Sequence, residues 1–136
     1  MSLDTIAPVL VAPPAERLVS RPVGDLLVGL VPAAGTVEIR HGDTVIASTT
    51  RAVELHEVDV PVRFYIPRED VRLELLHPID GTTFCPFKGV ANEYWSLASD
   101  PDGAPAAWSY PEPNPSFAEI GGHLAFYESL TLSVSA

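Results

Sequence analysis

Hydrophobic and polar residues alternate with a period of two along much of the chain from Thr36 onward. The clearest example is a pair of alternating runs, 36–41 and 44–48, on either side of Gly42-Asp43. Two such runs around a turn that contains glycine are typical of a β-hairpin. No segment keeps a helical period over three or four turns. The pattern therefore predicts an all-β fold with at most one or two short helical turns.

Shorter runs predict the remaining elements. Strands are expected at 62–66, 71–75, 94–97 and 106–110, and residues 52–58, with mixed periodicity, fit a strand or a helical turn. Turns are expected at 78–81 and 100–103, where Asp and Gly stand in turn positions, and one helical turn is expected at 116–120. Two apolar runs near the C-terminus, 123–127 and 130–134, suggest a final hairpin.

The length of 136 residues suits a single domain with one core. Its first quarter differs in composition because it is rich in proline, which argues against a long helix or a central strand. The prolines of this part are Pro8, Pro13, Pro14, Pro22 and Pro32. We therefore expect a proline-rich arm, residues 1–34, that lies extended across a single all-β domain, residues 35–136.

The formal net charge is -10, and no basic residue follows Lys88. This charge makes nucleic acid and anionic membrane surfaces unsuitable partners. The chain opens without a leader pattern, and no apolar run approaches the length of a membrane span. These features predict a soluble, cytoplasmic protein.

Residues 82–89 contain the only cysteine and the only lysine, Cys85 and Lys88. A single cysteine forms neither an internal disulfide nor a multi-thiolate zinc site, and the four histidines lack the spacing of metal ligands. We therefore expect no metal and no cofactor. Cys85 is either a thiolate favoured by the nearby ammonium or a small packing residue, and a thiol nucleophile would need a base that the sequence does not place beside it.

Four motifs follow one another with a spacing that resembles a bacterial family of unknown function, family 427. They are Tyr65–Val71, Thr83–Gly89, Trp108–Pro111 and Leu124–Tyr127, and the resemblance covers roughly residues 35–128. It implies small antiparallel sheets packed together in a β-tent-like fold. The family has also carried a nucleotidyltransferase-like label, which implies clustered carboxylates around Mg²⁺. The only Asp-x-Asp sequence, Asp100-Pro101-Asp102, precedes Gly103 in a predicted turn, so we expect no such metal site.

Several side chains are candidates for a ligand pocket. Arginine presents a planar fork that suits carboxylates and phosphates, a lysine contacts anions, and tyrosine and tryptophan stack on planar molecules or fill the core. The candidate ligand-binding residues are Arg51, Tyr65, Arg68, Cys85, Lys88, Tyr94, Trp108 and Tyr110. A structural ion pair with Glu69, Asp70 or another acid is the alternative for Arg68. Because neighbouring strand residues face opposite ways, Tyr94 and Trp95 cannot both be core on a regular strand.

The sequence leaves the function open among three classes. The first is a domain that binds a small anionic ligand near Lys88, with Cys85 and Lys88 as the weak catalytic candidates if it is an enzyme. The second is a protein-interaction or scaffold module that uses the corner from Trp108 to Pro115. It would lack a concave pocket near Lys88 and would expose an apolar patch. The third is a thiol-dependent redox enzyme. A homodimer is compatible with all three.

Overall fold

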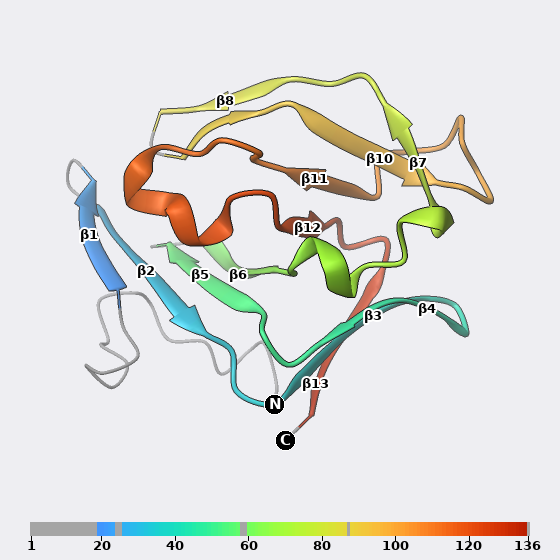
Figure 1. Ribbon diagram of the computed structural model, residues 1–136, viewed down its shortest axis with the longest axis horizontal. Coiled ribbons are helices and arrows are strands. Elements are labelled where there is room, and N and C mark those ends of the chain that lie inside the picture. The colour runs from blue at the N-terminus through green and yellow to red at the C-terminus, as the bar shows by residue number, and fades with distance from the viewer. Residues whose placement is uncertain (1–18, 24–25, 58–59, 87, 136) are drawn as a thin grey trace.

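The computed structural model describes residues 19–23, 26–57, 60–86 and 88–135. Within them the chain is built from small antiparallel sheets, as Figure 1 shows, so the all-β prediction is confirmed. The first sheet has the order β1–β2–β5–β6, and its strands are Val19–Val23, Leu26–Pro32, Val53–Glu57 and Val60–Tyr65. The second has the order β12–β11–β10–β7, with strands Leu124–Phe126, Ala107–Ser109, Glu93–Leu97 and Leu76–Ile79.

Two smaller sheets complete the described strands. The third has the order β13–β3–β4, with strands Thr131–Ser135, Thr36–His41 and Thr44–Thr49. The fourth pairs β8, Thr83–Cys85, with β9, Gly89–Ala91. The helical content consists of short 3₁₀ segments: η3, η4 and η5, at Arg68–Asp70, Leu73–Leu75 and Pro115–Ile120. No helix in the described part of the chain is long and apolar enough to cross a membrane.

The β3–β4 hairpin forms where the alternating pattern predicts it. Gly42 has a φ of 60°, which lies in the left-handed region that glycine adopts without steric cost. The predicted turn at 100–103 also forms, with the amide of Gly103 donating to the carbonyl of Asp100 at 2.9 Å. The ambiguous run at 52–58 includes β5, and the predicted helical turn at 116–120 lies within η5.

Three local predictions are wrong. The run 71–75 contains η4 instead of a strand, because Val71 forms only an isolated bridge with Ala47 before the chain turns. Residues 78–79, expected in a turn, belong to β7, an edge strand that accommodates Pro78. The two C-terminal runs do not form a hairpin with each other. Instead β12 pairs with β11, and β13 pairs with β3.

The proline-rich N-terminal part contributes to the first sheet. β2 lies between β1 and β5, contrary to the expectation that prolines keep this segment out of a central strand. The positions of the prolines explain the difference, since Pro22 lies in the edge strand β1 and Pro32 is the last residue of β2. Residues 1–18, the greater part of the expected arm, lie outside the described residues.

Two hydrophobic clusters lie on the two faces of β10. Trp95 belongs to the first cluster, with Val37, Ile39 and Ile66, whereas Tyr94 belongs to the second, with Leu55. Both aromatic side chains are therefore buried, although they point in opposite directions as the strand geometry requires. Tyr94 also borders a pocket, so the face that it occupies is part core and part cleft.

Candidate functional site

A pocket of about 380 Å³ lies between the first sheet, β8 and the second sheet. Its volume falls within the range of small-molecule sites in proteins. We call it the aromatic pocket, because four tyrosines and a tryptophan contribute to its walls. The lining residues are Glu57, Arg63, Tyr65, Thr83, Lys88, Tyr94, Trp108, Tyr110 and Tyr127.

Strand geometry explains why these side chains converge. Arg63 and Tyr65 are two residues apart on β6 and so project to the same side, while Val62 and Phe64 project into the first hydrophobic cluster. Tyr94 on β10 lies directly opposite Trp108 on β11 in the strand register. The aromatic pocket is therefore built from alternate positions of strands whose other positions fill the core.

Lys88 forms an ion pair with Glu57, whose Oε1 lies 2.7 Å from the Nζ of Lys88. The two side chains are only 13% and 16% exposed, respectively, so the pair is largely withdrawn from water. The ammonium also lies 6.0 Å from the centre of the Tyr110 ring, at the outer limit of a cation–π contact. The carboxylate of Glu57 therefore balances the positive charge of Lys88 in this structure.

The connection between β8 and β9 fixes the position of Lys88. The carbonyl of Lys88 accepts a hydrogen bond from the amide of Asn114 at 2.7 Å, and Gly89 has a φ of 111°. A Cβ at Gly89 would lie 3.3 Å from the amide nitrogen of Asn114. The space beside Gly89 is thus filled by the backbone of the chain itself.

The aromatic side chains pack against one another at the walls. The Tyr65 and Trp108 rings meet edge to face at 6.5 Å, and the Trp108 and Tyr127 rings lie 4.6 Å apart. The hydroxyl groups of Thr83 and Tyr94 are hydrogen-bonded at 2.5 Å. Burial raises the pKa of Tyr65 and of Tyr110 well above the usual range, so both phenols stay protonated at neutral pH.

Arg63 is the second cation of the aromatic pocket. Its guanidinium lies 5.7 Å from the centre of the Trp108 ring and donates to Glu128 at 2.9 Å. The Glu128 side chain is 79% exposed, so this pair is at the surface and contributes little to stability. Arg63, Glu57 and Thr83 carry no local signal in the sequence that marks them as pocket residues. Knowing that residues 53–57 and 60–65 are adjacent strands would have drawn attention to the first two.

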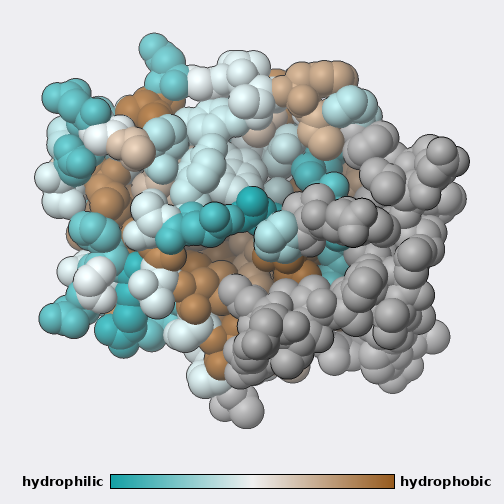
Figure 2. Space-filling view, turned by 180° about the vertical axis from the view of Figure 1, so that it is seen from behind, coloured by the Kyte–Doolittle hydropathy of each residue, from teal (hydrophilic) through white to brown (hydrophobic). Residues whose placement is uncertain are grey.

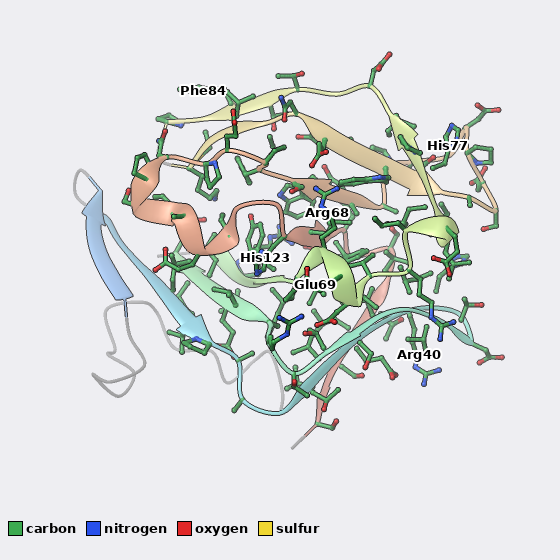
Figure 3. All side chains as sticks on the ribbon, viewed as in Figure 1. Arg40, Arg68, Glu69, His77, Phe84 and His123 are labelled. Carbon is green, nitrogen blue, oxygen red and sulfur yellow. The ribbon has the colours of Figure 1, made fainter. Side chains whose placement is uncertain are left out.

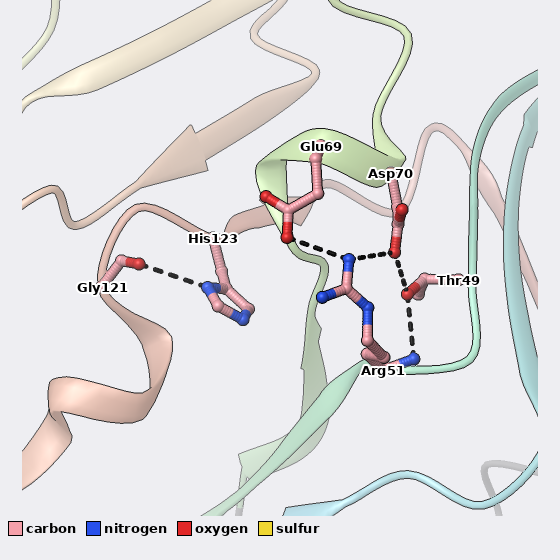
Figure 4. Close-up of polar contacts among 6 residues, drawn as sticks. All are labelled: Thr49, Arg51, Glu69, Asp70, Gly121 and His123. Atoms are coloured by element: carbon pink, nitrogen blue, oxygen red, sulfur yellow. Dashed lines mark hydrogen bonds and ion pairs between the residues drawn. The ribbon is translucent and has the colours of Figure 1, made fainter.

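Arg51 lies outside the aromatic pocket, in a surface network drawn in Figure 4. Its guanidinium donates to Glu69 at 2.9 Å and to Asp70 at 3.1 Å. The hydroxyl of Thr49 also donates to Asp70, at 2.6 Å. This bond, followed by the Arg51 contact, lowers the pKa of the Asp70 carboxyl below its usual value. The network ties β4 to η3 and has a structural role.

Arg68 is likewise outside the aromatic pocket. Figure 3 shows it between η3 and the second sheet, where its side chain is 35% exposed. Its guanidinium pairs with Glu93, donates to the carbonyl of Gly122 at 3.1 Å and lies 5.4 Å from the centre of the Trp95 ring. Arg68 therefore forms a structural ion pair, which was the alternative to ligand binding. Its partner is Glu93, because Glu69 and Asp70 pair with Arg51.

Cys85 is half-buried against the second hydrophobic cluster and does not line the aromatic pocket. Its Sγ accepts a hydrogen bond from the amide of Lys88 at 3.5 Å. Of the eight proposed ligand-binding residues, the structure brings five together: Tyr65, Lys88, Tyr94, Trp108 and Tyr110. Cys85, Arg51 and Arg68 are the three that it places elsewhere.

The two acidic residues of Asp100-Pro101-Asp102 are exposed in the connection between β10 and β11. In Figure 1 this connection lies at the opposite end of the molecule from the β8–β9 connection that carries Lys88. Ser96 anchors it by donating to the carbonyl of Pro101 at 2.8 Å. Among the described residues, no group of three or more His, Cys, Asp or Glu side chains is placed to share a metal ion.

Comparison with known proteins gives one family. None of the curated proteins matches the chain. Residues 29–135 match the model of a domain of unknown function, DUF427, which also carries a nucleotidyltransferase label. The match extends the resemblance at both ends, to include part of β2 and all of β13. The finer assignment to the β-tent group stays a prediction. The chain therefore belongs to the DUF427 family.

Proposed function

We propose that this domain binds a small anionic molecule in the aromatic pocket, near Lys88. The supporting observation is the pair of cations in the lining: Lys88 and Arg63 lie there, in a chain whose net charge is -10, and the carboxylate paired with Arg63, that of Glu128, is 79% exposed. Two cations brought to one pocket in so acidic a chain attract anions. The rings of Trp108 and Tyr127, which are less buried than those of Tyr65 and Tyr110, border the pocket beside Arg63.

The Lys88–Glu57 pair sets how an anion enters. Since Glu57 accepts a hydrogen bond from the Lys88 ammonium, an incoming carboxylate or phosphate competes with Glu57 or uses the remaining hydrogens of Lys88. Arg63 is easier to recruit because its partner Glu128 is exposed to water. The ligand therefore meets Arg63 first and Lys88 at greater depth.

Thermal shift and calorimetric titration against aromatic carboxylates, nucleoside monophosphates and inorganic phosphate test this function. Lys88→Gln and Arg63→Gln should each weaken binding about tenfold or more, since each removes a charge-assisted contact. Glu57→Gln should strengthen binding, because it frees Lys88. Arg51→Gln and Glu74→Gln change the charge by the same amounts outside the aromatic pocket and should leave affinity within about twofold at physiological salt, where distant charges are screened.

Lys88→Gln and Glu57→Gln are expected to change the affinity in opposite directions. Damage to the fold would weaken binding in both variants, so the two effects can be told apart. If no anion in the panel binds the wild type, or if Arg51→Gln weakens binding as much as Arg63→Gln, the proposed function is wrong. The double variant Lys88→Gln/Glu57→Gln keeps the buried site neutral. It should weaken binding while retaining the wild-type circular dichroism spectrum.

The corner from Trp108 to Pro115 offers less support for an interaction module. Trp108 is half-buried and Tyr110 is buried, so the apolar patch that this function requires is not exposed there. The large apolar side chain most exposed among the described residues is Phe84, on β8. Cys85 offers no specific observation for redox chemistry, so we do not propose that function.

A further inference from the structure

A second cavity, of about 330 Å³, adjoins the aromatic pocket. We call it the apolar pocket, because most of its lining is hydrophobic. Its lining residues are Ile39, Pro61, Val62, Arg63, Phe64, Ala125, Phe126, Tyr127, Glu128, Leu130 and Leu132. On the face of the molecule opposite to that of Figure 1, hydrophobic side chains show in brown beneath a band of hydrophilic ones (Figure 2).

The sheet edges explain why this cavity exists. β6 and β12 are the edge strands of the first and second sheets, and they are joined by an isolated bridge between Ile66 and Leu124. Two backbone hydrogen bonds close this bridge, at 2.8 and 2.9 Å. Beyond it, no ladder among the described strands joins β6 to β12. The apolar pocket lies in this opening, between residues 61–64 and 125–128.

The two pockets share Arg63 and Tyr127. At the shared boundary, the Arg63 guanidinium is the positively charged group, and its carboxylate partner Glu128 is exposed. An anionic head held by Arg63 would thus have cations and hydroxyl groups on one side and aliphatic side chains on the other. This charge pattern selects a molecule that is anionic at one end and apolar at the other.

We propose that the ligand is a linear amphiphile with one carboxylate, whose head lies in the aromatic pocket between Arg63 and Lys88. Its alkyl chain enters the apolar pocket along Phe126, Leu130 and Leu132. This inference rests on the proposed function, since it names the class of anion that the aromatic pocket receives. Beyond that function, it adds the apolar pocket as a second binding region, and it predicts that affinity depends on the length of the alkyl chain.

Calorimetric titration of the whole chain with butanoate, hexanoate, octanoate and decanoate, each below its micelle concentration, tests the proposal. Every additional methylene buried in the apolar pocket should tighten binding about fourfold. Leu132→Trp places a larger side chain in that pocket and should flatten this dependence, while binding of benzoate, which needs only the aromatic pocket, stays unchanged. Leu73→Trp adds the same side chain at an exposed position outside both pockets and should behave as the wild type.

The outcomes separate this inference from the proposed function. If benzoate binds but the affinity does not change with chain length from butanoate to decanoate, the proposed amphiphilic ligand is wrong and the anion site stands. If the chain-length dependence survives in Leu132→Trp, the alkyl chain adsorbs elsewhere and the inference is overturned. If no carboxylate binds but phosphate or a nucleoside monophosphate does, the inference is overturned and the anion site stands. If none of these anions binds, both fail. Should Leu132→Trp lose the wild-type circular dichroism spectrum, Phe126→Trp serves as the filling variant, with the same expected result.

Discussion

Lys88 and Glu57, 31 positions apart in the sequence, meet in an ion pair of 2.7 Å that is largely shielded from water. The pair ties the β8–β9 connection to the end of β5, so it joins the first and fourth sheets as well as lining the aromatic pocket. The only lysine of the chain therefore has a structural partner, and its energetics can be tested without a ligand.

Single substitutions of this pair should cost much more stability than the double substitution. Lys88→Met leaves the Glu57 carboxylate without its partner, and Glu57→Leu leaves the Lys88 ammonium without its own. Each should lower the free energy of unfolding by about 3 kcal/mol, whereas Lys88→Met/Glu57→Leu should stay within about 1 kcal/mol of the wild type. Urea unfolding of the four proteins measures the coupling energy. Strictly additive effects of the single substitutions would contradict the prediction.

An exposed pair provides the matched control for that experiment. Arg51 and Glu69 lie at the same kind of distance, 2.9 Å, but their side chains are 58% and 65% exposed. A double-mutant cycle on these two residues should show no coupling above experimental error, because water and salt screen the interaction. A coupling as large as that of Lys88 with Glu57 would mean that burial is not the cause.

Gly81→Ala should destabilise the protein and disturb the aromatic pocket. A Cβ at this position would lie 2.7 Å from Cδ1 of Tyr94, so the ring must move and its hydrogen bond with Thr83 is put at risk. We expect a loss of roughly 1–3 kcal/mol in urea unfolding, as for other overpacked sites. Gly42→Ala is the comparison, since it meets no atom within 4 Å and suffers only from its φ of 60°. An unchanged near-ultraviolet spectrum in Gly81→Ala would contradict the displacement of Tyr94.

Stability should fall at alkaline pH through Tyr65 and Tyr110. Burial raises the pKa of both phenols above their ordinary value of 10.0, so the folded protein holds protons that the unfolded chain has released. Their stabilising contribution is therefore complete below the unfolded pKa and is lost as the pH rises through the folded-state values. A spectrophotometric titration should show tyrosines that ionise late. Tyr65→Phe and Tyr110→Phe should each remove one of them, and unaltered titration curves would contradict the assignment.

Stability should also fall at acid pH through Asp70. The hydrogen bond from Thr49, and after it the contact with Arg51, holds the pKa of Asp70 below its unfolded value. This stabilisation is present above the unfolded pKa and is lost as the pH falls through the folded-state pKa. Thr49→Val should cost roughly 1–2 kcal/mol at pH 7, and this difference from the wild type should shrink in acid. Asp43→Asn, at an exposed position, is the control and should leave the pH dependence unchanged.

The elements predicted from the sequence are those whose signals are local. The β3–β4 hairpin needs only two alternating runs and Gly42, and all three are contiguous in the chain. The partner of β13 could not be predicted in this way, because its apolar residues would suit any sheet with a free edge. The same applies to Val71, whose single bridge with Ala47 ends where η4 begins.

The candidate site shows the same division. Unusual residues such as Lys88, Trp108 and Tyr110 are conspicuous in a sequence, and the structure places them around one pocket. Arg63 and Glu57 are ordinary strand residues, and only the pairing of β5 with β6 and the reach of Lys88 bring them there. The ion pair of Lys88 was inaccessible from the sequence, since its partner is a carboxylate from another sheet.

The pairing of β13 with β3 has a consequence for how the protein is made. Thr131 lies opposite Arg40, which is 91 positions earlier in the chain. During synthesis, β3 and β4 can form their hairpin early, but one edge of β3 has no partner until β13 has left the ribosome. Contacts between such distant segments form slowly, and an unpaired edge offers a place for other chains to bind. The interval between these two strands is therefore when the nascent chain is most open to aggregation.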